Sequence, residues 1–319
     1  MAEFKFACAQ CGQHIQCDTS YAGMQIDCPV CQQSIVVPQP PRAAASAAPS
    51  AAAPLVIKKS RTLQKVLIIA ALVLVLAALV IGGSWGYSKY KRHYLREHLP
   101  IGLVGLWSGD ENDLSGGMNA KLNDIAFAAG KSGKAFSFNG TSSSVKIPAS
   151  PSLDVGTGSG FTVMAWIKPT DVTQDHPLFE WSDSNYWGVH LHIAPGQPTV
   201  GSSGPAGPGQ LYANVVDSYG GWHPLGSAMD AVTANVFQHV ALTYDKVSGV
   251  ATIYCNGQVV SQRKLGSFNT RTSARDLYLG RRPAPSDEVS TFAGLMDDAA
   301  LFNRALSAEE IQKIYAAQK

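Results

Sequence analysis

Four of the six cysteines form two short pairs near the start of the chain. The pairs are Cys8-Ala-Gln-Cys11 and Cys28-Pro-Val-Cys31, with sixteen residues between them. Each Cys-x-x-Cys turn directs two sulfur atoms to one centre, and two such turns supply the four thiolates that zinc prefers. Two disulfides or a thioredoxin-type redox pair are weaker alternatives, because a redox pair occurs singly and in a βαβ context. The spacing therefore predicts one zinc ion held by Cys8, Cys11, Cys28 and Cys31.

Residues 1–37 resemble a zinc ribbon, with Phe4-Lys5-Phe6 and Ile35-Val36-Val37 as the expected strands. A module this small cannot bury enough apolar surface to fold alone, so we expect the metal to supply its folding energy. His14 and Cys17 are alternative ligands, but their spacing fits neither pair. Residues 1–37 have a net charge of −2 and no cluster of Lys and Arg, which phosphate binding needs. We expect a structural or protein-docking role and no nucleic-acid partner.

Aromatic residues near glycine-rich segments form a second group that could do chemistry. The group comprises, in chain order, Trp181, Tyr186, Trp187, Tyr212 and Trp222. A Gly-, Pro- and Ser-rich stretch spans residues 195–210, and Gly220-Gly221 precedes the last tryptophan. Aromatic rings in such loops can stack on sugar or peptide ligands, whereas the alternative for each tryptophan is a place in a core. We predict that these five residues bind a ligand.

Short strands must position these residues. Apolar and polar residues alternate repeatedly beyond residue 101, for example over residues 161–167, 239–244 and 250–254. Asn256-Gly257 predicts a tight hairpin, because both central positions need positive φ. Helical periodicity is convincing only over residues 308–317, after Ser307 as N-cap. The pattern predicts a mainly β, two-sheet sandwich over residues 101–319.

Several motifs of this region occur in a familiar order. They are Leu103-Val-Gly-Leu-Trp107, Gly133-Lys-Ala-Phe-Ser-Phe-Asn-Gly140, Phe161-Thr-Val-Met-Ala-Trp-Ile-Lys-Pro169, Gln238-His-Val-Ala-Leu-Thr-Tyr-Asp245 and Gly294-Leu-Met-Asp-Asp-Ala-Ala-Leu-Phe-Asn303. Together they resemble a laminin G-like domain of the concanavalin A-like lectin/glucanase superfamily, which implies a jelly-roll sandwich. The superfamily contains lectins, adhesion modules and glycoside hydrolases, so the resemblance does not choose a function.

The resemblance allows a test for catalysis. Glucanases of the superfamily carry Glu-x-Asp-x-x-Glu, and a retaining glycosidase needs two carboxylates about 5 Å apart. None of the five glutamates after residue 101 begins this pattern. The nearest match, Glu180-Trp-Ser-Asp183, places its carboxylates on opposite faces of a strand. We predict that the protein is not an enzyme.

The resemblance also implies a calcium site. Many relatives hold a structural Ca²⁺ with the acidic residue of a Phe-Asp-Gly turn and one aspartate of a late Asp-Asp pair. The turn here is Phe138-Asn139-Gly140, while Asp297 and Asp298 remain and Asp113 is a third acid. The implied ligands are thus Asp113, Asn139, Asp297 and Asp298, with fewer charges and weaker binding. The alternative is that these residues cap turns.

An uncharged apolar run of sixteen residues begins at Val66, which is long enough, with the residues after it, to cross a bilayer. Its distance from the N-terminus argues against a signal peptide. We predict a spanning helix at residues 66–87, after a linker at 38–60 and a basic flank at 61–65, and before a basic juxtamembrane segment at 88–100. Basic flanks suit anionic headgroups better than nucleic acid. Because zinc thiolates need a reducing compartment, we expect a cytoplasmic N-terminus.

These observations predict a single-pass cell-membrane protein with an extracytoplasmic lectin-like sandwich. The sandwich would recognise a glycan or protein ligand, and the cytoplasmic ribbon would be a structural module or dock a cytoplasmic protein. One alternative is a structural envelope or adhesion protein without a small ligand. Another is a glycoside hydrolase of the same superfamily. Exposed aromatic residues in a cluster favour the binding protein, whereas two carboxylates facing each other across a cleft would favour the hydrolase.

Overall fold

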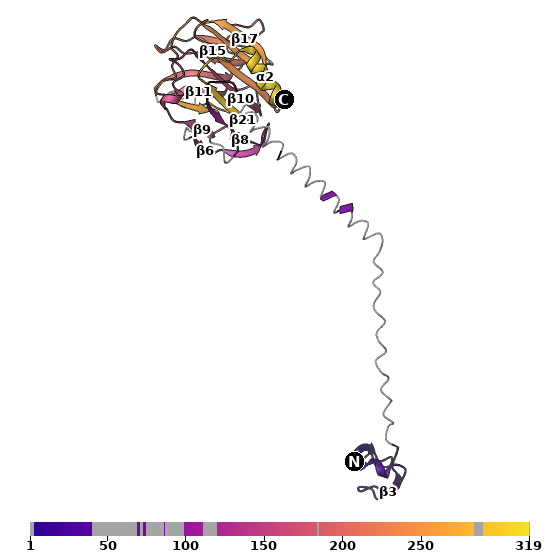
Figure 1. The fold of residues 1–319 in the computed structure, drawn as a ribbon. Coiled ribbons are helices and arrows are strands. Elements are labelled where there is room, and N and C mark those ends of the chain that lie inside the picture. The colour runs from indigo at the N-terminus through magenta and orange to yellow at the C-terminus, as the bar shows by residue number, and fades with distance from the viewer. Residues whose placement is uncertain are drawn as a thin grey trace. The chain divides into compact units, whose positions relative to one another are not determined.

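The structure is a computed structural model of the 319-residue chain (Figure 1). It describes residues 3–39, 99–110, 120–183, 185–283 and 290–318, together with the single or paired residues 69, 70, 73, 74 and 86. The chain divides into two compact units, Met1–Val73 and Leu74–Lys319. Each unit is described by itself.

The structure contradicts the predicted single-pass membrane location. Among the described residues, no helix is both long enough and apolar enough to span a bilayer. Most of the predicted span at 66–87 lies outside those residues, as do the basic flank at 61–65 and most of segments 38–60 and 88–100. The prediction rested on the length of the uncharged apolar run and on Trp85 and Tyr87 at its end. The orientation that we assigned from the cysteine thiols depended on that span, and it is withdrawn with it.

The first unit consists of two hairpins of similar design. Strand β1 (Glu3–Ala7) pairs with β2 (His14–Asp18), and β3 (Gln25–Asp27) pairs with β4 (Ser34–Val36), with the 3-10 turn η1 (Thr19–Tyr21) between the hairpins. Each hairpin has a Cys-x-x-Cys turn between its strands and an isoleucine seven residues after its first cysteine. The core of the unit is correspondingly small, and its buried members are Cys8, Ile15, Cys28 and Ile35.

The second unit is a sandwich of two antiparallel sheets. The eight-stranded sheet has the order β17-β16-β15-β10-β21-β8-β7, and β5 also pairs with β21. Its strands are β5 (Leu103–Trp107), β7 (Ala126–Ala129), β8 (Lys134–Asn139), β10 (Gly160–Pro169), β15 (Gln238–Asp245), β16 (Val250–Cys255), β17 (Gln258–Lys264) and β21 (Ala293–Phe302).

The seven-stranded sheet has the order β14-β13-β12-β11-β18-β9-β6. Its strands are β6 (Lys121–Asn123), β9 (Ser144–Ile147), β11 (His176–Ser182), β12 (Trp187–Ile193), β13 (Leu211–Asn214), β14 (Pro224–Gly226) and β18 (Asp276–Leu279). A short ribbon of β19 (Arg281–Arg282) and β20 (Ser290–Thr291) follows β18, and the 3-10 turn η2 (Pro151–Leu153) follows β9. The predicted mainly β sandwich is thus confirmed.

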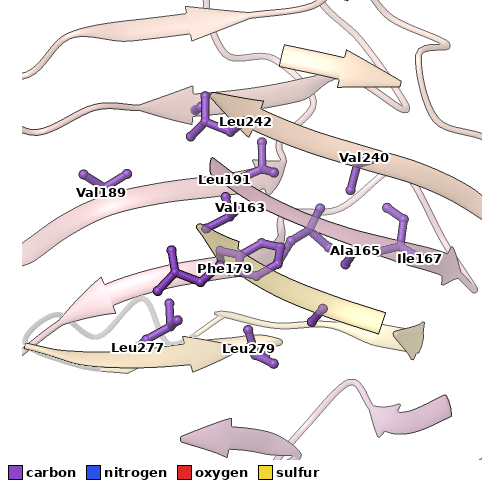
Figure 2. Close-up of a cluster of buried hydrophobic side chains, with 14 of the residues drawn as sticks. Val163, Ala165, Ile167, Phe179, Val189, Leu191, Val240, Leu242, Leu277 and Leu279 are labelled. Atoms are coloured by element: carbon purple, nitrogen blue, oxygen red, sulfur yellow. The ribbon is translucent and has the colours of Figure 1, made fainter. Parts of the chain in front are cut away.

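The core lies between the two sheets (Figure 2). Because side chains alternate along a strand, β10 directs every second residue inward. Val163, Ala165 and Ile167 of β10 meet Phe179 of β11 and Leu191 of β12 across the interface, and all five are fully buried. Apolar burial of this kind stabilises the sandwich by roughly 25 cal/mol for each Å² removed from water.

The predicted hairpin and helix are both present. Asn256 and Gly257 connect β16 to β17 with φ of 51° and 76°, so both positions have the expected left-handed conformation. Helix α2 (Ala308–Gln318) begins after Ser307, whose Oγ accepts a hydrogen bond from the N–H of Glu310 at 3.2 Å. The helix packs on the outer face of the eight-stranded sheet, where Ile311 contributes to a second apolar cluster. The outer face of the seven-stranded sheet carries polar and aromatic residues, among them Glu180, His192 and Tyr212.

Candidate functional site

The four paired cysteines converge in the first unit. The Sγ atoms of Cys8 and Cys31 are 3.9 Å apart, and those of Cys11 and Cys28 are 3.7 Å apart. All four sulfur atoms lie within 4.8 Å of one another, and none is in a disulfide. Four sulfurs arranged tetrahedrally, each about 2.3 Å from a common zinc ion, would be about 3.8 Å apart. The cysteine group therefore has the donor type and the spacing that zinc needs.

Backbone hydrogen bonds shape the two cysteine turns. The N–H of Cys8 donates to the carbonyl of Gln13 at 2.8 Å, and the N–H of Cys28 donates to the carbonyl of Gln33 at 2.9 Å. The N–H groups of Cys31 and the residue before it lower the pKa of Cys28 to about 6, which favours the thiolate that a metal binds. The two alternative ligands considered from the sequence, His14 and Cys17, are not part of the group.

The implied calcium ligands do not converge. The Oδ1 atom of Asn139 accepts hydrogen bonds from the N–H groups of the residues two, three and four positions later, at 2.9 to 3.1 Å, so it caps a turn. Strand β21 aligns Ala293 with Asn139, and Met296 with Phe136. Asp297 is four residues beyond Ala293, which places it roughly 13 Å along the strand from Asn139. The calcium site was expected from relatives that have an aspartate in this turn, and this chain has Asn139 there instead.

The two late aspartates are engaged within the protein. The Oδ2 atom of Asp297 accepts from the N–H of Ser132 at 3.0 Å, and Oδ2 of Asp298 accepts from Nε2 of Gln318 at 3.1 Å. Asp113 lies outside the described residues. Within the described ranges, the cysteine group is the only cluster of His, Cys, Asp or Glu that could hold a metal ion. The implied calcium site is therefore not supported.

An aspartate-centred turn follows strand β11 and presents two aromatic side chains. The Oδ1 atom of Asp183 accepts from the N–H groups of Asn185 and Tyr186, each at 2.8 Å, and Oδ2 pairs with Arg275 at 2.8 Å. Burial opposes ionisation of Asp183, but these hydrogen bonds and the arginine charge lower its pKa. The turn is thereby held in one shape, with Tyr186 and Trp187 at its end.

A second turn of the same kind connects β13 to β14. The Oδ1 atom of Asp217 accepts from the N–H groups of Tyr219 and Gly221 at 2.8 and 2.9 Å, and Oδ2 lies 3.0 Å from Nε2 of His223. Burial opposes ionisation again, but the histidine and the N–H groups lower the pKa of Asp217. This turn presents Tyr219 and Trp222. We call the turns at Asp183 and Asp217 the two aspartate turns.

A pocket of about 380 Å³ lies between the two aspartate turns. Its lining residues are Asn185, Tyr186, Trp187, Tyr219, Gly220, Trp222 and Arg271. The rings of Trp187 and Trp222 are 6.3 Å apart. The exposed fractions of Tyr186, Trp222 and Tyr219 are 59%, 57% and 95%. Such large aromatic side chains are usually more buried, so their gathering at one pocket indicates a surface for a ligand.

Two of the five predicted ligand-binding residues lie elsewhere. Trp181 is fully buried, with its ring 6.0 Å from that of Phe161, because the alternation of β11 turns it into the core. Tyr212 is on the outer face of the seven-stranded sheet, but only 7% of it is exposed, and its ring is 6.2 Å from that of His190. Neither lines the pocket. The prediction is retained for Tyr186, Trp187 and Trp222.

A buried ion network adjoins the pocket on the same sheet face. Glu180 of β11 has no exposed surface, and its Oε2 atom accepts from Nε of Arg282 at 2.8 Å and from Nε2 of His192 at 3.0 Å. The other ring nitrogen of His192 lies 3.1 Å from Asp175. The guanidinium of Arg282 lies over Trp187, 4.6 Å from its ring centre, and connects the network to the pocket.

The protonation states of the network follow from these contacts. Burial and Arg282 act against a charged His192, but a carboxylate at each ring nitrogen raises its pKa, which favours the imidazolium. Burial lowers the pKa of the adjacent His190 to about 3, despite the nearby Glu180. Burial also opposes ionisation of Asp175, yet its pKa is lowered to about 2, chiefly by His192. Two cations and two anions leave the network neutral.

The ion network does not have the form of a glycosidase site. Glu180 is closed to solvent and holds two cations, so a substrate cannot reach it. Both carboxylate oxygens of Asp183 are engaged, Oδ1 by N–H groups of its own turn and Oδ2 by Arg275. A larger hollow of about 450 Å³ lies beside the start of α2 and has three charged lining residues. Arg304 and Glu310 pair with each other, and Asp245 accepts hydrogen bonds from the N–H of Val247 at 3.0 Å and from Oγ of Ser248 at 2.7 Å. The aromatic pocket remains the better candidate.

Several residues of this surface escaped the sequence analysis. Tyr219 was detectable in principle, because Asp217-Ser-Tyr-Gly-Gly221 has the signature of a turn that exposes its central residues. Arg271 carries no local signal. It reaches the pocket because its N–H donates to the carbonyl of Val216 at 2.8 Å, beside a bridge between Asp217 and Thr270. That pairing joins distant segments and is invisible in a local pattern.

Comparisons with known structures support the fold. The binding domain of Paraclostridial Mosquitocidal Protein 1 is similar with a TM-score of 0.52 and 14% identity, over 67% of this chain and 52% of that chain. The binding domain of botulinum neurotoxin DC, in complex with SialylT, has a TM-score of 0.51 and 13% identity, over 69% and 52% of the two chains. The match thus spans about half of each neighbour. At these identities the likeness shows the fold alone.

A third similar structure is domain 4 of AbnA, a GH43 extracellular arabinanase from Geobacillus stearothermophilus, in complex with arabinotriose. Its TM-score is 0.49 at 22% identity, over 67% of this chain and 98% of that chain. No curated protein matches the sequence. A family model described as the concanavalin A-like lectin/glucanases superfamily matches residues 139–312, more than half of the chain. The chain therefore belongs to the concanavalin A-like lectin/glucanases superfamily, through the laminin G-like family of this model.

Proposed function

We propose that residues 101–319 form a glycan-binding module that binds without catalysis. The observation that carries this proposal is the pocket between the two aspartate turns, where Tyr186, Tyr219 and Trp222 expose their rings beside Trp187. Flat aromatic faces offer contact area to the apolar faces of sugar rings at a small entropy cost. A module that only packed against neighbours would have no need of a hollow between two rigid turns.

The inaccessible Glu180 supports binding rather than hydrolysis. Its carboxylate is fully buried and is shared by two cations, whereas a general acid must reach the glycosidic oxygen. The role of Glu180 in the proposal is to hold Arg282 in place over the ring of Trp187. Binding in a single small pocket is expected to be weak, so multivalent attachment to a glycan-rich surface is the expected mode.

The experiment is a glycan-binding screen with the full chain and matched alanine variants. Tyr219→Ala and Trp222→Ala should each reduce retention on the best glycan at least tenfold, because each removes a ring that lines the pocket. Tyr21→Ala is the control, since Tyr21 is a half-exposed aromatic residue in the other unit. Absence of binding to every glycan, or equal binding by both pocket variants and the parent, would overturn the proposal.

For the first unit we infer one structural zinc ion, held by Cys8, Cys11, Cys28 and Cys31. The donor set and the sulfur spacing support this assignment. The ion would supply the folding energy that the small core lacks. Met24, Val30 and Val36 each expose more than half of their side chains, and these apolar surfaces support the protein-docking role.

A further inference from the structure

The charge of the aromatic pocket has one source among its described lining residues, which is Arg271. Its guanidinium lies 5.3 Å from the ring centre of Tyr186. Gly220 approaches it so closely that a Cβ there would lie 2.9 Å from Nη2 of Arg271. The arginine head is thus fixed between the two aspartate turns, with a tyrosine on one side and the backbone of the second turn on the other.

No carboxylate of the described residues forms an ion pair with Arg271. The two nearby acids are occupied. Asp183 binds two N–H groups and Arg275, and Asp217 binds two N–H groups and His223. The other arginine beside the pocket, Arg282, is neutralised by Glu180. The lining has no carboxylate, and its one guanidinium has no carboxylate within ion-pair distance among the described residues, which favours an anion.

We propose that the pocket selects an acidic sugar, with Arg271 binding its carboxylate while Trp222 and Tyr186 contact the ring. This assignment rests on the proposed glycan-binding function and adds the class of ligand. A guanidinium presents two parallel N–H groups that match the two oxygens of a carboxylate. The hollow of about 380 Å³ is at the small end of ligand pockets, which suits a terminal or single acidic residue better than a long stretch of polymer.

The test uses the full chain and pairs of sugars that differ in charge. The first pair is trigalacturonate and its fully methyl-esterified form, and the second is 3′-sialyllactose and lactose; a sulfated lactose is the third probe. Binding is followed by calorimetry and by the fluorescence of the pocket tryptophans. The acidic member of at least one pair should bind roughly tenfold more tightly than its neutral partner, and the preference should shrink in 0.5 M NaCl because salt screens partly exposed charges.

Arg271→Gln should remove the preference while the neutral partner binds as before. Arg271→Lys should keep part of it, because lysine retains the charge without the planar fork. Lys313→Gln is the control, since it removes an equally positive, exposed side chain from α2 on the other sheet. Melting temperatures check that the variants are folded.

Four results would overturn the acidic-sugar assignment. Equal affinity for the acidic and neutral members of both pairs, or a preference that survives in Arg271→Gln, would leave the glycan-binding function intact and remove only the assignment. Binding of the sulfated probe alone would replace the carboxylate by a sulfate. If no sugar binds, both the proposed glycan-binding function and the acidic-sugar assignment are wrong.

Discussion

The two units of this chain reach stability by different routes. The apolar cluster of the first unit has four buried side chains, and two of them are cysteines of the candidate zinc group. The sandwich buries more than thirty apolar side chains between its sheets. Because the entropy lost on folding grows with every ordered residue, the first unit cannot balance it with apolar burial alone. The sandwich can.

The two units also differ in how far substitutions of their functional residues should affect stability. In the first unit, the candidate ligands Cys8 and Cys28 are half of the buried apolar cluster, so function and stability cannot be separated. In the sandwich, the pocket lies outside the core, and its turns are held by their own aspartates. The following variants test this contrast, from the largest expected effect on stability to the smallest.

Loss of one cysteine should unfold the first unit completely. Cys28→Ser removes one of four thiolates, so the bound zinc should fall from one ion per chain to near zero, and the amide protons of residues 1–37 should lose their protection from exchange. The melting transition of the sandwich should not move. Cys17→Ser is the control, because Cys17 lies outside the group. A Cys28→Ser protein with full zinc content would remove Cys28 from the ligand set.

Within the sandwich, the largest effect is expected in the buried ion network. Glu180→Gln keeps the shape of the side chain but leaves His192 and Arg282 without their shared anion, and breaking a buried pair in this way costs about 3 to 5 kcal/mol. Chemical denaturation measures the change in the free energy of unfolding. The matched control is Glu309→Gln, since that glutamate is exposed on α2. A Glu180→Gln variant as stable as the parent would show that the network contributes nothing.

Stability should depend on pH in opposite directions through two neighbouring histidines. The pKa of His192 is raised above 6.5, so its contribution is complete below pH 6.5 and is lost as the pH rises through the raised value. Burial lowers the pKa of His190 to about 3 and that of His239 to about 4. Their contributions are complete above pH 6.5 and are lost as the pH falls.

The melting temperature of the sandwich should therefore pass through a maximum near the ordinary histidine pKa. On the acidic side, each histidine that stays neutral when folded costs about 1.4 kcal/mol per pH unit until its own low pKa is reached. His192→Gln should lower the maximum and flatten only the alkaline side. An unchanged alkaline slope in that variant would show that His192 is neutral in the folded protein.

Local patterns in the sequence were sufficient for much of the fold. Alternation of apolar and polar residues identified β10, and the Asn256-Gly257 pair identified a hairpin. The repeated Cys-x-x-Cys spacing identified the four cysteines that converge. The laminin G-like resemblance also proved correct. These predictions held because neighbouring residues along the chain decide them.

Long-range geometry decided the rest. Trp181 and Trp187 flank one turn and look alike in sequence, yet the pleat of β11 sends the first into the core while the turn carries the second to the pocket. Arg271 and Trp222 line the same pocket only because segments that are far apart in sequence pair at Asp217 and Thr270. The ion network needs β11, β12, the loop residue Asp175 and the arginine of β19. None of these long-range contacts can be recognised from a short stretch of sequence.

The smallest expected effect on stability belongs to the pocket itself, in Trp222→Ala. More than half of this side chain is exposed and its loops are fixed by Asp217, so its removal should change the free energy of unfolding by less than about 1 kcal/mol. Trp181→Ala is the matched reference, because the same substitution in the core should cost about 3 to 5 kcal/mol. Denaturant unfolding of both variants gives the two values side by side. If Trp222→Ala lost as much stability as Trp181→Ala, the ring would be part of the structural core, and the contrast between a stable sandwich and a separable pocket would fail. If it lost almost none while glycan retention fell, the pocket would be a surface that the sandwich carries without depending on it.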